Sequence, residues 1–433
     1  MRAAVVGGGW AGIAASVSLA DAGHDIAVFD MAPQLGGRAR SVAGPDTEYP
    51  YDNGQHILIG AYRDSLALMR RLGVDPAQAL KRLPLALPYP GEPGLRLPPG
   101  APLIAFTRGV LAHRSWPLSA RLGLLLAAGG WLARGFRCDT DLSVARLCAG
   151  LPAAVKRDLV EPLCVAALNT PAPQASAQVF LRVLKDALFS GAGSADLLLP
   201  CQPLSELLAG PAADWLGARL RLGTRVQRIE PGWRVDGETF DAVVLACTSM
   251  EAARLVAPLD EGWAATAQAL AFEPIITVYL DSPGSALPAP MLALRDGPDA
   301  PAQFVFDHGQ LGGKPGRFAF VVSGAAPWVA SGGCAEAVLA QATRELGWAT
   351  PPRIDRMLTE KRATFACTPG LQRPPARIAP GLWAAGDYIA GPYPATLEGA
   401  VRAGLAAAQG VCADAGAGTG AKGAASGSPT NTP

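Results

Sequence analysis

Residues 3–12 read AAVVGGGWAG, and this stretch decides the fold. The small apolar residues predict a buried strand, the glycines allow a tight turn, and the alanine-rich segment that follows predicts a helix that Gly23 ends. Residues 26–29 (IAVF) predict a second strand. Strand, glycine turn, helix and strand together predict a βαβ unit, the beginning of an α/β fold.

The glycine turn has the spacing of a dinucleotide site. Gly7, Gly9 and Gly12 follow the pattern GxGxxG, which lets a pyrophosphate approach the backbone N–H groups at the start of the helix. Asp30 lies eighteen residues past Gly12, at the end of the second strand, where its carboxylate can bind the hydroxyls of an adenosine ribose. The N-terminal unit is therefore expected to bind a dinucleotide.

Two further stretches favour a flavin over a nicotinamide. Residues 35–41 (LGGRARS) place a second glycine turn and Arg38 where they can clamp the pyrophosphate from its other side. Residues 382–387 (LWAAGD) predict a strand that ends in Gly-Asp, and residues 394–401 (PATLEGAV) begin a helix. Asp387 can accept a hydrogen bond from a ribityl hydroxyl, and the helix N-terminus can face the electron-rich edge of the flavin ring.

The chain is long enough for two interleaved domains, since it has 433 residues of which half are apolar. We expect an FAD-binding Rossmann-like domain made of residues 1–75, 190–255 and 375–411, and an α+β substrate domain made of residues 76–189 and 256–374. Strands over 220–226, 233–235 and 241–247 would return the chain to the cofactor domain. Residues 412–433 are rich in Ala, Gly, Ser, Thr and Pro, a composition that predicts a disordered tail.

Charge and cysteine content exclude other classes of protein. Lys plus Arg is 37 and Asp plus Glu is 36, so nothing attracts a nucleic-acid backbone. The eight cysteines contain no Cys-x-x-Cys pair and no histidine at ligand spacing, which predicts no metal site and reduced thiols in a cytoplasmic protein. The N-terminus has no secretory signal pattern, and no apolar run is long enough to span a bilayer.

One apolar region has two open interpretations. Residues 101–136 mix leucines and tryptophans with isolated arginines. This pattern fits a helix that lies in a membrane interface, and it fits equally a buried helix of the core.

The motifs resemble the flavoprotein superfamily of amine oxidases and phytoene desaturases. More narrowly, residues 52–62 (DNGQHILIGAY), 168–171 (LNTP), 198–200 (LLP) and 392–400 (PYPATLEGA) look like the hydroxysqualene dehydroxylases, the squalene-associated desaturase-like family of bacterial hopanoid synthesis. The resemblance extends from residue 2 to about 410. Two positions depart from relatives: Asp30 replaces a frequent Glu, and Thr396 stands where an amine oxidase has an aromatic residue of its amine cage.

The resemblance implies FAD as cofactor and assigns residues to its site. The expected cofactor-binding residues are Gly7, Gly9, Trp10, Ala11, Gly12, Asp30, Gly36, Gly37, Arg38, Gly54, Val226, Gly386, Asp387, Ala395, Thr396 and Leu397.

The resemblance also implies a reaction, in which hydroxysqualene loses its allylic hydroxyl and receives a hydride equivalent from reduced FAD, giving squalene. The substrate would be a hydrophobic C30 isoprenoid, and departure of hydroxide would need a polar group, for which Gln55, His56 and Tyr393 are the candidates. An external donor must reduce the flavin, because no second nucleotide motif is visible. A substrate dissolved in lipid implies peripheral attachment to the cytoplasmic face of the membrane, with residues 101–136 as the candidate region.

Two alternatives remain open. A carotenoid or phytoene-type desaturase would run the same flavin in the oxidising direction. A non-catalytic prenyl-lipid carrier of the same architecture would need no complete flavin site, although every flavin motif is intact here.

Overall fold

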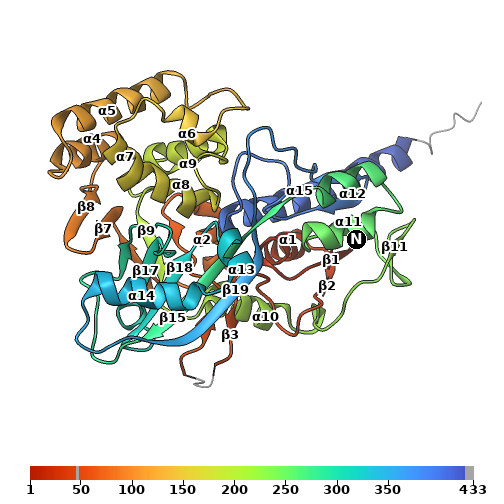
Figure 1. The fold of residues 1–433 in the computed structure, drawn as a ribbon. Helices are drawn as coiled ribbons and strands as arrows, with labels where there is room; N and C mark the ends of the chain where they lie inside the picture. The colour runs from red at the N-terminus through yellow and green to blue at the C-terminus, as the bar shows by residue number, and fades with distance from the viewer. Residues whose placement is uncertain (45–47, 425–433) are drawn as a thin grey trace, which may run out of the picture.

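The computed structural model describes residues 1–44 and 48–424 (Figure 1). Its first layer is a six-stranded sheet of order β10-β2-β1-β14-β21-β20, in which only the edge strand β20 runs antiparallel to its neighbour. The strands are β1 (Arg2–Val6), β2 (Asp25–Phe29), β10 (Leu220–Arg221), β14 (Ala242–Leu245), β20 (Arg377–Ala379) and β21 (Leu382–Ala384). Strands from all three segments of the expected cofactor domain thus meet in one sheet, while the exact domain boundaries stay a prediction.

The expected strand over 220–226 is wrong beyond its first two residues. Gly223 has a φ of +63°, a conformation that turns the backbone out of an extended path. The N–H of Gly223 donates to the carbonyl of Ala32 and that of Thr224 to the carbonyl of Asp30, so this segment follows the loop after β2.

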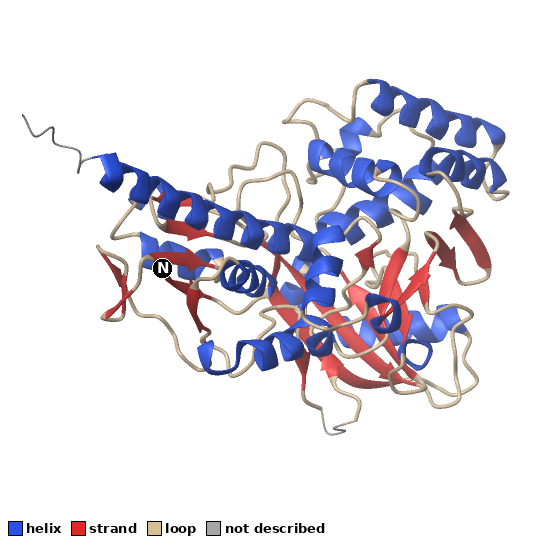
Figure 2. Cartoon of the chain, turned by 180° about the vertical axis from the view of Figure 1, so that it is seen from behind, coloured by secondary structure: helices blue, strands red, loops and turns tan. Residues whose placement is uncertain are grey.

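Helices α1 (Trp10–Asp21) and α15 (Leu397–Ala424) lie side by side on this sheet (Figure 2). The contact is close, because a Cβ on Gly404 would lie 2.1 Å from the carbonyl oxygen of Ala11. The disorder predicted from composition for residues 412–433 is wrong for residues 412–424, because α15 continues to Ala424. Alanine favours the helix, and Asp414 Oδ2 accepts hydrogen bonds from the N–H groups of Gly381 and of the Trp383 indole, both at 2.9 Å. Residues 425–433 lie outside the described residues.

A second, five-stranded antiparallel sheet has the order β16-β17-β18-β15-β19. Helix α14 (Cys334–Leu346) packs on it through a shared apolar core that includes Val338, Ile276 and Phe320, and α13 (Ala326–Ser331) lies beside it. The strands are β15 (Phe272–Asp281), β16 (Met291–Ala293), β17 (Phe304–Asp307), β18 (Arg317–Val322) and β19 (Arg353–Phe365).

A lobe of helices forms the third part and projects away from the first sheet (Figures 1 and 2). Asn169 fastens it to the second sheet: its Nδ2 donates to Thr364 Oγ1 at 3.0 Å, and its Oδ1 accepts the N–H of Gly324 at 2.7 Å. The lobe consists of α4 (Pro102–Ala112), α5 (Leu118–Ala133), α6 (Val144–Leu147), α7 (Ala153–Val155), η1 (Lys156–Val160), α8 (Glu161–Leu168) and α9 (Ala177–Phe189).

Short elements connect these parts. They are β3 (Ser41–Val42), β4 (Tyr51–Asp52), β5 (Leu58–Ile59), α2 (Arg63–Arg71), α3 (Pro76–Ala79), β6 (Leu80–Leu83), β7 (Ala86–Tyr89), β8 (Glu92–Arg96), β9 (Leu197–Pro200), η2 (Ser205–Ala209), α10 (Gly210–Leu216), η3 (Gly217–Arg219), β11 (Ile229–Glu230), β12 (Arg234–Val235), β13 (Glu238–Thr239), α11 (Ser249–Val256), α12 (Glu261–Gln268) and η4 (His308–Leu311). Among the described residues, no helix is both long and apolar enough to cross a bilayer.

Candidate functional site

The turn between β1 and α1 brings several stretches of backbone into contact. A Cβ on Gly7, whose φ is +113°, would lie 2.5 Å from the carbonyl oxygen of Ala246, and a Cβ on Gly12 would lie 1.8 Å from the carbonyl oxygen of Gly7. Around Gly9 there is space, since the nearest atom to a Cβ would be Gly37 Cα at 3.9 Å. Among the residues that the structure describes, no side chain caps the N-terminus of α1. This open cradle at a helix N-terminus fits a pyrophosphate.

Asp30 lies beside the turn, directly after β2. Its Oδ2 accepts the N–H of Gly8 at 2.6 Å, and its Oδ1 accepts the N–H of Ala32 at 2.7 Å. The carboxylate is therefore fixed at the carboxyl edge of the sheet. Each oxygen keeps a lone pair that can accept a ribose hydroxyl.

Arg38 connects the two ends of the chain. Its Nη2 donates to Asp387 Oδ2 at 2.6 Å, and its Nη1 donates to the carbonyl of Ala363 at 2.6 Å. Just before it, Gly36 donates to the carbonyl of Gly8 at 2.9 Å, so the second glycine turn lies directly against the first. A guanidinium is thus held beside the cradle, where it can bind a pyrophosphate.

The C-terminal motif completes this edge. Gly386 has a φ of +155°, and a Cβ there would lie 2.6 Å from the ring of Tyr388. Asp387 is buried. Ala395 and Thr396 precede α15, and Thr396 Oγ1 accepts the N–H of Gly399 at 3.0 Å, as an N-cap does.

Three of the seven buried side-chain polar atoms that lack a hydrogen-bond partner in the described chain lie at the carboxyl edge of the sheet. In the described part of the chain, the buried atoms without a hydrogen-bond partner include Trp10 Nε1, Ser249 Oγ and Tyr388 OH. These residues follow β1, β14 and β21, three neighbouring strands of one sheet. In doubly wound sheets a ligand binds at this edge, and polar groups that await a ligand explain the pattern.

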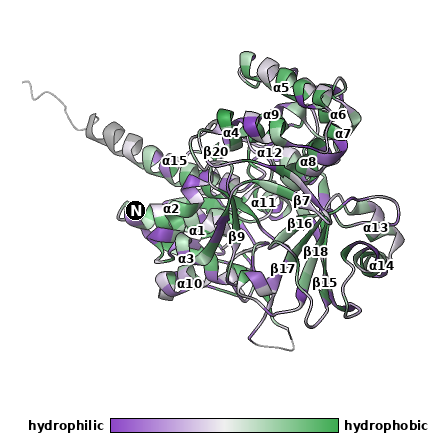
Figure 3. Cartoon of the chain, turned by 90° about the vertical axis from the view of Figure 1, so that its left-hand side faces the viewer, coloured by the Kyte–Doolittle hydropathy of each residue, from purple (hydrophilic) through white to green (hydrophobic). Residues whose placement is uncertain are grey.

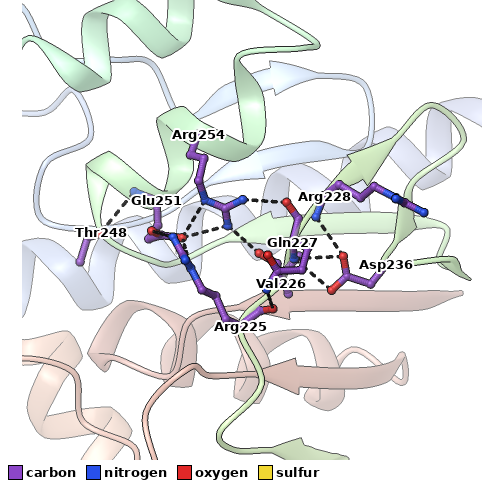
Figure 4. A network of polar contacts seen from close by, with 8 residues as sticks. All are labelled: Arg225, Val226, Gln227, Arg228, Asp236, Thr248, Glu251 and Arg254. Carbon is purple, nitrogen blue, oxygen red and sulfur yellow. Dashed lines mark hydrogen bonds and ion pairs between the residues drawn. The ribbon is translucent and has the colours of Figure 1, made fainter.

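Val226 is buried at the same side of the sheet, in a segment held by the network in Figure 4. Arg254 Nη2 donates to the carbonyl of Val226 at 2.6 Å and pairs with Glu251, which Arg225 also binds at 2.6 Å. Within the residues described, the N–H of Val226 makes no hydrogen bond. It is therefore available to a ligand such as the adenine of a dinucleotide.

The expected catalytic candidates begin with Gln55, which follows Gly54 (φ +90°). Gln55 Nε2 donates to the hydroxyl of Tyr279 at 3.1 Å. That hydroxyl donates to the carbonyl of Asp52 at 2.8 Å and accepts the N–H of Asp52 at 3.1 Å. Tyr279 is fully buried in β15, so the second sheet positions Gln55.

Burial raises the pKa of Asp52 to about 6, and hydrogen bonds from Ser41 Oγ and the N–H of Leu204 only partly oppose this. The unfolded chain loses this proton near pH 4, but the folded chain keeps it to about pH 6. We therefore expect the free energy of unfolding to fall by about 2 kcal/mol as the pH rises from 4 to 6.

Asp52→Asn should remove this dependence, because the amide resembles the protonated carboxyl. Urea unfolding of both proteins from pH 4 to 7 measures it, with the exposed Asp21→Asn as a control. Parallel pH profiles of wild type and Asp52→Asn would show that Asp52 does not titrate in this range.

His56 has its Nδ1 3.4 Å from the carbonyl oxygen of Gly54. Burial lowers the pKa of the imidazole to about 4, the Gly54 carbonyl raises it, and the positive charge of Arg38 lowers it further. At neutral pH the ring is uncharged. It can donate a hydrogen bond, but it holds no extra proton to transfer.

Tyr393 lies apart from these two candidates. Its hydroxyl accepts hydrogen bonds from Arg182 Nη2 at 2.9 Å and from Arg402 Nη1 at 2.8 Å. It lines a cavity of about 310 Å³ whose described walls include neither Gln55 nor His56. Gln55 faces a smaller space of about 60 Å³, beside His308 and Arg317. Neither described cavity is lined by both Gln55 and His56, and the cavity that Tyr393 lines includes Gly386 and Asp387 of the C-terminal motif.

The fold and this edge of the sheet define a flavoprotein oxidoreductase. A family model described as "Flavin containing amine oxidoreductase" matches residues 10–412. The chain belongs to this family, and FAD is its cofactor.

Two proteins named hydroxysqualene dehydroxylase are similar to the chain over nearly its whole length. The chain is 27% identical to hydroxysqualene dehydroxylase of Rhodopseudomonas palustris, over 93% of this chain and 96% of that protein. It is also 27% identical to the protein of that name from Sinorhizobium fredii, with the same coverage. The resemblance predicted from the sequence motifs is confirmed. A more distant relative is the 15-cis-phytoene desaturase of Capsicum annuum, at 24% identity over 95% of this chain and 77% of that protein.

Among solved structures, an oxidoreductase from Methanosarcina mazei superposes with a TM-score of 0.72 at 15% identity, covering 94% of this chain and all of that chain. This likeness confirms the predicted fold class.

Proposed function

We propose that this enzyme converts hydroxysqualene to squalene in bacterial hopanoid synthesis. The observation that carries the proposal is the likeness to proteins named hydroxysqualene dehydroxylase over more than nine-tenths of both chains. Thr396 adds support, because an aromatic cage for an amine is incomplete there. The substrate is then an uncharged C30 isoprenoid.

The reaction replaces an allylic C–OH bond by C–H and releases water, consuming two electrons and two protons. Reduced FAD supplies the hydride equivalent when it is bound, and an external reductant restores it. The chain itself must hold the allylic carbon in place and bind the departing hydroxyl. Gln55 keeps one amide N–H for that hydroxyl after its bond to Tyr279. Neutral His56 can donate from Nε2 in the tautomer that leaves Nδ1, beside the Gly54 carbonyl, without a proton. Tyr393 could bind the departing hydroxyl only if the substrate enters the cavity of about 310 Å³ that Tyr393 lines.

The role of Gln55 can be tested by changing Tyr279, the residue that positions it. Tyr279→Phe removes the hydroxyl that holds both Gln55 and the Asp52 backbone, and should lower kcat about tenfold with FAD content unchanged. Tyr89→Phe is the matched control, because its hydroxyl donates to the carbonyl of Asp158 in the helical lobe. Equal kcat values in the two variants would show that the Tyr279 hydroxyl does not position Gln55 for catalysis.

A direct test of the reaction is anaerobic. The purified protein is reduced with dithionite, hydroxysqualene is added, and the flavin spectrum is followed while the lipid is extracted. Flavin reoxidation with formation of squalene is expected. Persistent reduced flavin without squalene would contradict the proposal.

A second candidate is a phytoene-type desaturase, favoured by the likeness to the Capsicum annuum protein. The oxidised enzyme would then convert a phytoene-like polyene to a more unsaturated product. A prenyl-lipid carrier is the least supported alternative, and a protein that stays colourless after FAD addition would favour it. Because the proposed substrate dissolves in lipid, we place the enzyme at the cytoplasmic face of the membrane as a peripheral protein.

A further inference from the structure

The free end of the helical lobe exposes apolar side chains. Among the described residues, twelve large apolar side chains are exposed, and seven of them lie in α4 and α5. These seven are Leu103, Ile104, Leu111, Leu118, Leu122, Leu126 and Leu132. Figure 1 shows both helices at the outer end of the lobe, away from the two sheets, and Figure 3 shows α5 at the top of the lobe. We call these residues the lobe face.

Helix α5 has no polar side to turn toward water. Its inner side buries Ala120, Leu124 and Trp131. Its outer side presents Leu118, Leu122 and Leu126 at four-residue spacing, and Leu126 is 78% exposed. A helix that is apolar on every side is normally buried on every side, but no described part of the chain covers the outer side of α5.

Within the segment that carries the lobe face, residues 93–138, every charged residue is an arginine. Between Glu92 and Asp139 the sequence contains six arginines and no acidic residue. Four of the arginines are exposed and form no ion pair within the described chain: Arg108, Arg114, Arg134 and Arg137. Arg121 instead joins the two helices, since its side chain donates to the carbonyls of Trp116 and Leu111, both at 2.9 Å.

We propose that the lobe face docks on a bilayer that contains anionic phospholipids. The leucines enter the boundary between headgroups and acyl chains, and the four exposed arginines bind the phosphates. This inference rests on the proposed function in one respect: a substrate dissolved in lipid is the reason why the enzyme needs a lipid surface. The apolar face and its charge stand on the structure alone.

A second copy of the chain fits this face less well. A two-fold interface places the same surface on both partners, so the arginines of one copy would face those of the other with no carboxylate from residues 93–138 between them. Anionic lipid supplies the missing negative charge.

The test is flotation of the full-length FAD-loaded protein with vesicles. Wild type should float with phosphatidylglycerol-containing vesicles and much less with phosphatidylcholine alone. Leu122→Glu/Leu126→Glu should stay in the dense fraction. Ile354→Glu/Met357→Glu is the matched control, because it changes two exposed apolar residues of β19 and should float like wild type.

The arginines provide an independent variant with an intact apolar surface. Replacing Arg108, Arg114, Arg134 and Arg137 by Gln should weaken binding to anionic vesicles about fivefold for each residue, equivalent to ~1 kcal/mol each. Added salt should weaken wild-type binding in the same direction.

Equal flotation of the leucine variant and its control, or no flotation of wild type, would overturn the proposal. So would light scattering that shows a wild-type dimer dispersed by the leucine variant without vesicle binding, since this would make the face an interface between copies. Squalene formation from detergent-dispersed substrate separates the two proposals. The leucine variant should form squalene from dispersed substrate as wild type does. If wild type forms no squalene in this assay, the proposed reaction is contradicted but the docking proposal is not.

Discussion

Replacement of Gly12 by alanine is expected to raise the Kd for FAD by about 10- to 100-fold. The added Cβ would lie 1.8 Å from the carbonyl oxygen of Gly7, a backbone atom that cannot move without opening the turn. Either the turn or the start of α1 must shift, and the N–H groups that face the pyrophosphate shift with it. Titration of the apoprotein with FAD measures the effect.

The control for this variant is Gly129→Ala in α5, where a Cβ would meet no atom within 4 Å. That change should leave the Kd for FAD unchanged. A Gly12→Ala protein that folds and binds FAD like the control would show that the cradle at α1 does not hold the cofactor.

Glu398→Gln is expected to lower the free energy of unfolding by about 2 to 4 kcal/mol. Glu398 is 2% exposed and accepts hydrogen bonds from the N–H groups of Asp64 and Ser65, the Ser65 hydroxyl and Arg402 Nε. An amide must point its NH₂ group at donors on one side. The change therefore weakens the contact between α2 and the first turn of α15. The start of α15 completes the flavin site.

Urea unfolding measures this loss, with Glu336→Gln as the control. Glu336 also lies in the first turn of a helix, α14, but it is exposed, so its replacement should change stability by no more than about 0.5 kcal/mol. Similar losses for the two variants would mean that the buried contacts of Glu398 contribute little.

Local sequence signals predicted the elements that carry the cofactor. The apolar run before Gly7, the spacing of Gly9 and Gly12, and the Gly-Asp step at 386–387 are short-range patterns with one structural solution. The sequence motifs also anticipated that residues 38 and 387 serve one site. Their direct pairing is a structural finding.

Other features depend on contacts that no local pattern records. Tyr279 is one aromatic residue in an apolar strand, and its bond to Gln55 spans more than two hundred residues of chain. The helix that continues through residues 412–424 includes Asp414, whose carboxylate accepts the Trp383 indole N–H, a contact that the composition of this segment does not record. The strand predicted over 220–226 fails because Gly223 turns the chain, although its apolar and polar residues alternate as in a strand.

The central claim is that Arg38 and Asp387, from opposite ends of the chain, form one flavin site. Measuring FAD binding to variants of these two residues tests it most directly. Titration of the apoprotein should give one FAD per chain, and Arg38→Met and Asp387→Ala should each raise the Kd at least about tenfold. The exposed Arg71→Met should leave it unchanged. Wild-type affinity in either Arg38→Met or Asp387→Ala, with the protein folded, would contradict a flavin site assembled from both ends of the chain.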